Sequence, residues 1–348
     1  MFVDIYKTLI FTPKYKTMRS IKEFKAFLNT LEGQEIQDKF ELFNVFYLLD
    51  DFNSIEAERT VPDLMRYDLA AFSQVIAQMP EPNSIEEAKA LYIQIIDHTV
   101  PCLDPADGDF ITAGDYRNML HALISLSFVL SHNYPAYFIP YLYRYKMYQL
   151  AQTAEACDFD LPPMPKANDW RARCMYYWEL CETLYHYRIK HDLISIELWT
   201  FLYHFAPMCI PSLNFGDLPA PTHIWWLGKR ESIDEYRSTT ITHLRPSARK
   251  GDLMVRYEAT PKRGITGFWR VLSDAIVDPI DPQYTYCYVG NRLDTPLLTS
   301  AELKADAYFS KHPLCKRHFL DSDGRMISEA DLKQLLQLLH AKGFDVQF

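Results

Sequence analysis

Glycine is scarce in this sequence, with 11 residues among 348. The chain contains no Walker A loop and no GxGxxG, GxSxG or HExxH pattern. Phosphate-binding loops and dinucleotide folds need such glycines, many hydrolases need the GxSxG turn, and many zinc peptidases need paired helical histidines. These absences disfavour all of these classes. We therefore expect no catalytic residue of these kinds, no cofactor and no bound metal.

Long apolar runs and paired cysteines are also missing. No stretch approaches the roughly 20 uninterrupted apolar residues that span a bilayer. The apolar N-terminal run contains Asp4 and Lys7 and lacks the small-residue cleavage site of a signal peptide. The seven cysteines are odd in number, occur singly and form no CxxC motif. We therefore expect a cytoplasmic protein with reduced, mostly buried thiols and no membrane partner.

Charge is distributed unevenly along the chain, whose net charge is −9. Residues 1–220 contain 18 Lys and Arg against 29 Asp and Glu, whereas residues 221–348 contain 18 against 16. Residues 229–270 alone contain ten basic and five acidic side chains. A polyanion is therefore expected to meet the second part of the chain, although basic side chains that only solvate a β surface would give the same count.

The length of the chain favours two domains, and its 48% hydrophobic residues indicate well-packed ones. Residues 1–210 show helical periodicity, with capping boxes at Ser20–Glu23 and Ser84–Glu87. Further helices are predicted over residues 64–79, 115–132, 140–154, 170–190 and 196–205, with Pro140 in a first turn. The predicted fold class is α+β: an all-α domain over 1–210, a linker over 211–222 and a second domain over 223–348.

After the linker, the hydrophobic period shortens to two residues. Two runs show it: Leu253, Val255 and Tyr257 alternate with Met254, Arg256 and Glu258, and Ile265, Gly267, Trp269 and Val271 alternate with Thr266, Phe268 and Arg270. Further strands are expected at 224–227 and 286–289. Capping boxes at 299–302 and 328–331 open two helices. The second domain is therefore predicted to be small and β-rich, with a few helices.

Two features of the helical part are candidate sites. Cys181 and His186 lie five residues apart on one predicted helix, which places them on different faces and disfavours a catalytic pair. The run 132–150 contains six tyrosines, a residue type that packs its ring and keeps its hydroxyl at the edge of a core or an interface. A protein partner or self-association through these tyrosines is therefore an alternative function.

Aromatic and basic residues come together in the second domain. Trp225, Trp226 and Trp269 lie on its predicted strands, and five cations surround the 250–271 hairpin: Lys250, Arg256, Lys262, Arg263 and Arg270. This combination suits nucleic acid, because bases stack on rings while phosphates bind Arg and Lys. Tryptophans in small β domains more often belong to the core, and both interpretations stay open from the sequence.

The order of these features resembles the EVE domain, a member of the PUA-like superfamily that is related to YTH domains. The family pattern, roughly GDxxxxY…GIxGxxxV…DP, is matched over residues 220–348. The matching positions are Gly251, Asp252, Tyr257, Gly264, Ile265, Gly267, Val271, Asp278 and Pro279. Residues 228–249 align poorly, and residues 1–210 resemble no family that we can name.

The resemblance implies a bent β-barrel with flanking helices that accepts a modified or flipped-out nucleotide in an aromatic pocket. It makes Trp225, Trp226 and Trp269 candidate ring platforms, and Gly264 and Gly267 positions of close backbone approach. It makes the five cations candidate phosphate ligands, while Asp252 is expected to fix the turn before its strand. We therefore expect a non-enzymatic protein that binds DNA or RNA. The alternatives are an interaction scaffold and an enzyme that acts on nucleic acid.

Overall fold

The computed structural model describes residues 21–49, 69–98, 115–209, 217–229, 239–280, 285–317, 319 and 324–345. It is a mixed α/β structure that divides into two compact units. Unit 1 comprises residues 1–212 together with 278–282, and unit 2 comprises residues 213–277 and 283–348. The start of the predicted linker, residues 211–216, lies outside the described part of the chain.

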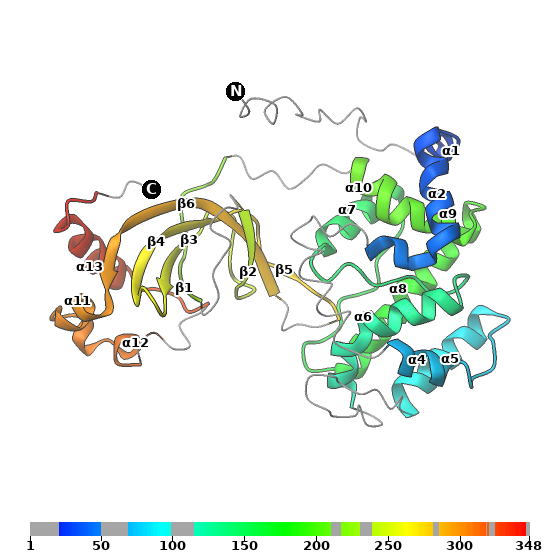
Figure 1. The fold of residues 1–348 in the computed structure, drawn as a ribbon, viewed down its shortest axis with the longest axis horizontal. Helices are drawn as coiled ribbons and strands as arrows, with labels where there is room; N and C mark the ends of the chain where they lie inside the picture. Colours follow the sequence, from blue (N-terminus) through cyan, green and yellow to red (C-terminus); the bar gives the residue numbers. More distant parts are fainter. Residues whose placement is uncertain are drawn as a thin grey trace. The chain divides into compact units, whose positions relative to one another are not determined.

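The described elements of unit 1 are helical, as the 3.6-residue period predicts. They are α1 (Ile21–Leu28), α2 (Leu31–Phe43), the 3₁₀ helix η1 (Asn44–Leu49), α4 (Leu69–Ile76), α5 (Ile85–His98), α6 (Tyr116–Asn133), α7 (Met147–Cys157), α8 (Trp170–Lys190), α9 (Ser195–Thr200), the π-helix η2 (Phe201–Phe205) and α10 (Ala206–Cys209). Helices α6 and α8 run side by side (Figure 1). The Tyr92 hydroxyl on α5 donates a 2.7 Å hydrogen bond to the Cys174 carbonyl on α8. None of the helices in the described part of the chain is long and apolar enough to cross a membrane.

The tyrosine-rich segment is not the helix predicted from Pro140, because α7 begins only at Met147. The Tyr141 amide donates instead to the Ser127 hydroxyl of α6 at 2.8 Å. Tyr141, Tyr143 and Tyr145 are all buried within the protein, at 0–4% exposure. These three rings are therefore already packed inside the chain and, as they lie, are not available to the partner expected in the scaffold alternative.

The segment 278–282 carries a buried carboxylate into unit 1. Asp278 is fully buried and accepts a 2.9 Å hydrogen bond from the Tyr141 hydroxyl. Its second oxygen lies 3.4 Å from Nε of Arg144, which is itself buried, and Arg173 donates to the Pro279 carbonyl at 2.7 Å. Asp278 and Pro279 were expected to belong to a continuous domain over 223–348. In the structure, the polar groups of Asp278 and Pro279 pair with those of the helical unit.

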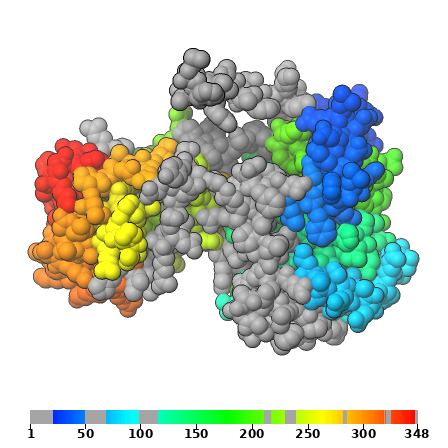
Figure 2. Space-filling model, in the orientation of Figure 1, coloured from blue at the N-terminus to red at the C-terminus, as the bar shows by residue number. Residues whose placement is uncertain are grey.

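Unit 2 is built on a curled six-stranded sheet with the order β1-β3-β4-β6-β2, in which β5 also pairs with β6 (Figure 1). Its elements are β1 (Ile224–Lys229), β2 (Thr239–His243), β3 (Leu253–Glu258), β4 (Gly264–Val271), β5 (Ile276–Val277), β6 (Thr285–Thr299), α11 (Ser300–Ala305), the 3₁₀ helix η3 (Phe309–Lys311), α12 (Pro313–Lys316) and α13 (Glu329–His340). Strands β1 and β3 are parallel, and β3, β4 and β6 are successively antiparallel. The capping boxes of Thr299 and Ser328 open α11 and α13 as predicted, and α13 lies at the surface (red in Figure 2).

The two faces of the sheet form two apolar cores. Trp226, Leu253, Val255 and Tyr257 pack with the leucines of α13 on one face. Trp225, Met254, Trp269 and Val271 pack together on the other face. The alternation predicted for β3 is confirmed, but in β4 Ile265 joins the first core while Trp269 joins the second. A register shift between Ile265 and Gly267 explains the difference, because a bulge moves later side chains to the opposite face.

Candidate nucleic-acid interface

The start of β3 is organised by the buried carboxylate of Asp252. It accepts hydrogen bonds from the Trp225 indole at 2.9 Å, the His223 amide at 2.9 Å and the Arg249 amide at 3.0 Å. The hydroxyl and the amide of Thr222 also donate to it, at 2.8 and 3.3 Å. Burial alone would raise the pKa of Asp252, but these donors together hold that pKa below its ordinary value. The expectation that Asp252 fixes this turn is confirmed.

The three candidate tryptophan platforms lie in the core. Trp225, Trp226 and Trp269 are 0–1% exposed. Trp226 contacts the Phe319 ring at a centroid distance of 5.2 Å, and the Trp269 ring lies 5.9 Å from the Arg256 guanidinium carbon. A base needs a free ring face for stacking. In this structure the tryptophans stabilise unit 2 and offer no such face, so the core interpretation describes them.

The two candidate glycines are required by the sheet itself. A Cβ on Gly264 would lie 2.5 Å from the Leu298 carbonyl oxygen, and one on Gly267 would lie 2.4 Å from the Leu293 carbonyl oxygen. Both distances are well below van der Waals contact, so only glycine allows β4 to approach β6 this closely. The space beside each glycine is therefore filled by the backbone of a neighbouring strand, and no ligand could use it.

Two of the five candidate phosphate ligands, Arg256 and Arg270, have guanidinium groups that bind groups of unit 2. Arg256 is 2% exposed and lies 3.2 Å from the Glu258 carboxylate. The Arg270 guanidinium donates to the carbonyls of Gly251 and Pro219 at 2.6–3.0 Å. Arg270 therefore links β4 to the segments around Gly251 and Pro219, whereas Arg256 pairs with a neighbour on its own strand. Their predicted contact with phosphate would require these bonds to break.

The other three candidates lie at opposite ends of β3. Lys262 and Arg263 are exposed at the tip of the β3–β4 hairpin, where Lys262 pairs with Glu258 at 3.1 Å. Lys250 lies three residues before the start of β3, and its backbone amide donates to the Asp274 side chain at 2.9 Å. Six residues of strand span about 20 Å. The structure therefore does not bring the predicted cations together in one patch.

Sequence reasoning missed two further arginines on the loop that contains Lys250. Arg245 and Arg249 are exposed on the loop between β2 and β3, in the segment RPSARKGD (245–252). The Arg245 side chain donates to the Gly324 carbonyl at 3.3 Å, and the Arg249 side chain donates to the carbonyls of Pro246 and Ala248 at 2.9 and 3.0 Å. In the sequence, this group is indicated by the three basic residues within RPSARK (245–250).

An aromatic ring lies at the same end of the sheet. The side chain of His223 is about one-third exposed, and its ring centroid is 5.8 Å from that of Trp225. The amides of His223 and Arg249 bond to the same Asp252 carboxylate, which holds the two residues close together. His223, Arg245, Arg249 and Lys250 form what we call the Asp252 loop cluster. It combines a ring with three cations, which is the chemistry that single-stranded nucleic acid requires.

The candidate pair in unit 1 lacks the properties of a nucleophile. Burial raises the pKa of the Cys181 thiol to about 12, although hydrogen bonds to the Ile139 backbone and the Tyr177 side chain oppose the shift. Thiolate, and not thiol, is the reactive form of cysteine. At neutral pH, Cys181 is therefore a protonated core residue.

Comparison with known proteins adds little to this description. No family model and no curated protein matches the chain. Matching solved structures include a hypothetical protein from Leishmania major, with 20% identity, a TM-score of 0.29 and coverage of 35% of this chain and 97% of that one. An NMR structure of a protein from Rhodopseudomonas palustris matches with 21% identity, a TM-score of 0.24 and coverage of 28% and 67%. At such TM-scores neither structure informs the fold or the function.

Proposed function

We propose that unit 2 is a PUA-like, EVE-type module that binds nucleic acid and recognises a modified or flipped-out nucleotide. The ordered residues from Gly251 to Val271 support the resemblance. The observation that carries the binding proposal is the Asp252 loop cluster, in which Arg245 and Arg249 are exposed on a loop that a buried carboxylate holds in place.

The arginines of the Asp252 loop cluster are suited to phosphate because no described carboxylate pairs with their guanidinium groups. Within the described residues, the Arg245 and Arg249 side chains donate to backbone carbonyls and to no carboxylate. Phosphate contacts by such arginines would supply affinity without sequence preference. Stacking of a base on His223 would add about 1–3 kcal/mol if it matches the usual value for aromatic side chains. The buried tryptophans keep their structural role in this proposal.

Fluorescence anisotropy on the full chain tests the proposal with single-stranded DNA and RNA, unmodified and base-methylated. The double variant Arg245→Ala, Arg249→Ala should weaken binding. Its salt dependence should also become shallower, by about 0.7 log units per log unit of salt for each phosphate that the variant no longer neutralises. A matched control, Lys311→Ala with Lys316→Ala, removes two exposed cations from η3 and α12 and should bind like the wild type.

Three outcomes distinguish parts of the proposal. If no oligonucleotide binds better than a neutral polymer at low salt, nucleic-acid binding is wrong. If binding occurs but both double variants lose affinity equally, the cluster is not the site. Equal affinity for methylated and unmodified oligonucleotides of every kind would contradict recognition of a modified base.

A further inference from the structure

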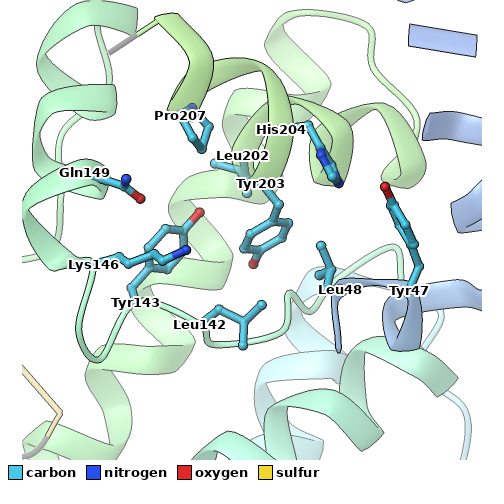
Figure 3. A pocket seen from close by; sticks show the side chains of 10 residues that line it. All are labelled: Tyr47, Leu48, Leu142, Tyr143, Lys146, Gln149, Leu202, Tyr203, His204 and Pro207. Atoms are coloured by element: carbon cyan, nitrogen blue, oxygen red, sulfur yellow. The ribbon is translucent and has the colours of Figure 1, made fainter. Parts of the chain in front are cut away.

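Unit 1 contains a pocket of about 280 Å³ that plays no part in the function proposed for unit 2 (Figure 3). Side chains from η1, the 139–146 segment, α7, η2 and α10 line it. Small-molecule sites usually begin near about 300 Å³. The pocket lies just below this lower limit, which matches a ligand of one ring system with a substituent and is too small for a dinucleotide.

A π-helix shapes one wall of this pocket. Within η2 the Ala206 amide donates to the Phe201 carbonyl, five residues earlier. Pro207 follows, and in a regular α-helix it would have to donate to Tyr203 although it has no N–H. The wider turn carries Tyr203 and His204 along the wall. Single π turns inside α-helices occur frequently at functional sites.

The aromatic lining is arranged in two stacked pairs. The rings of Tyr143 and Tyr203 are stacked at a centroid distance of 5.7 Å, and those of Tyr47 and His204 at 5.3 Å with an interplanar angle of 13°. The Tyr203 hydroxyl donates to the Pro140 carbonyl, which fixes its ring. Burial raises the pKa of both Tyr143 and Tyr203 well above the ordinary value, so both hydroxyls stay neutral at physiological pH. The lining is therefore aromatic and carries no negative charge from these tyrosines.

A single lysine sets the charge of the lining. Lys146 and Gln149 lie on one side of the pocket, opposite Tyr47 and His204 (Figure 3). No carboxylate is present among the described residues of the lining. Lys39, whose ammonium lies 5.6 Å from the Tyr47 ring, is paired with Glu35 at 2.8 Å. Lys146 has no such ion pair among the described residues, which leaves its ammonium for a ligand.

We propose that this pocket binds a small aromatic acid, whose ring lies among the tyrosine and histidine rings and whose carboxylate pairs with Lys146. The amide of Gln149 can donate to the same carboxylate. A charge-assisted hydrogen bond of this kind is markedly stronger than a neutral one, so the acid should be preferred over an uncharged molecule of the same shape.

Calorimetry on the full chain tests the proposal with benzoate and indole-3-carboxylate, each compared with its carboxamide. The acid should bind at least roughly tenfold more tightly than the amide, which is the effect expected for one hydrogen bond to a charged group. Lys146→Met should abolish that preference, and Lys146→Arg should retain most of it. Lys166→Met, which replaces an exposed lysine of unit 1, is the matched control and should change nothing.

Lys146 is suitable for substitution because it makes no side-chain cap on α7. The proposal is overturned if neither acid binds at millimolar concentration, or if amide and acid bind equally to the wild type. It is also overturned if Lys146→Met, with an unchanged circular dichroism spectrum, keeps the wild-type preference for the acid. The comparison of acid with amide needs no variant, so it decides the matter even if Lys146→Met fails to fold.

Discussion

The carboxylate of Asp252 should be indispensable to unit 2, and Asp252→Asn is the sharpest test of this. The substitution keeps the size of the side chain but replaces one acceptor oxygen by an NH₂ donor. One carboxylate oxygen accepts from the Trp225 indole and the Arg249 amide, and the other accepts from Thr222 and His223. In either orientation of the asparagine amide, at least two donors would therefore face another donor.

The magnitude follows from this count of donors. A hydrogen bond to a charged group contributes about 1.5–3 kcal/mol, so the removal of two should lower the free energy of unfolding by about 3–6 kcal/mol. Solvent offers little compensation because Asp252 has 0% exposure. The matched control is Asp274→Asn, which changes an exposed aspartate that accepts one backbone hydrogen bond at 2.9 Å from Lys250. It should cost roughly 1 kcal/mol or less.

Hydrogen exchange measured by mass spectrometry is the appropriate assay, because a chain of two units need not unfold in one step. In Asp252→Asn, peptides covering β1 and β3 should lose about 3–6 kcal/mol of protection, while peptides from α6 and α8 should be unchanged. A decrease of less than about 1 kcal/mol, comparable with that of Asp274→Asn, would refute the view that this carboxylate holds the turn and β1 together.

Three further perturbations concern the β4–β6 pair, the Asp278 ion pair and Glu302. Gly267→Ala should destabilise unit 2 by about 1–3 kcal/mol, because the added methyl group would clash with the backbone of β6. The urea midpoint should therefore fall, and an unchanged midpoint would show that β4 and β6 can move apart. Asp278→Asn should destabilise unit 1 by about 3–5 kcal/mol, because the buried Arg144 guanidinium would lose the negative charge of Asp278. The double variant with Arg144→Met should recover part of that stability in thermal unfolding. The hydrogen bond from Lys342 is the largest of the interactions that lower the pKa of Glu302 to about 2, so Lys342→Met should raise that pKa in an NMR titration. Because the folded-state pKa is depressed, this pair stabilises the protein above about pH 4.3 and the contribution disappears as the pH falls toward 2; a Glu302 pKa that does not move would contradict the assignment.

Local signals in the sequence predicted the elements whose ends depend on nearby residues. The capping boxes at Thr299 and Ser328 start α11 and α13, and the alternation of β3 is that of the structure. The helix predicted from Pro140 does not form, because the backbone of this segment is bonded to other parts of the chain, including the Ser127 hydroxyl. Local periodicity carries no information about such partners.

The candidate site was harder to predict than the fold. A tryptophan beside cations has the same sequence pattern whether its ring is exposed or buried, and only the packing of two apolar faces distinguishes Trp269 from a ligand platform. The cations were expected together because they are close in sequence. However, a strand extends its residues, so Lys250 and Lys262 end far apart. Arg249 gains its position from Asp252, and Arg245 donates to the Gly324 carbonyl, through bonds that no local pattern reveals.

The placement of residues 278–282 in unit 1 has a consequence for how the protein is made. During synthesis the first 212 residues are complete long before Asp278 is added. Until then the contacts of Asp278 with the Arg144 guanidinium and the Tyr141 hydroxyl cannot form. The helical unit should therefore reach its final stability only after β1 to β5 have been synthesised. A nascent chain stopped at residue 212 should be more sensitive to protease than one stopped after residue 282, although both contain all the described helices of unit 1.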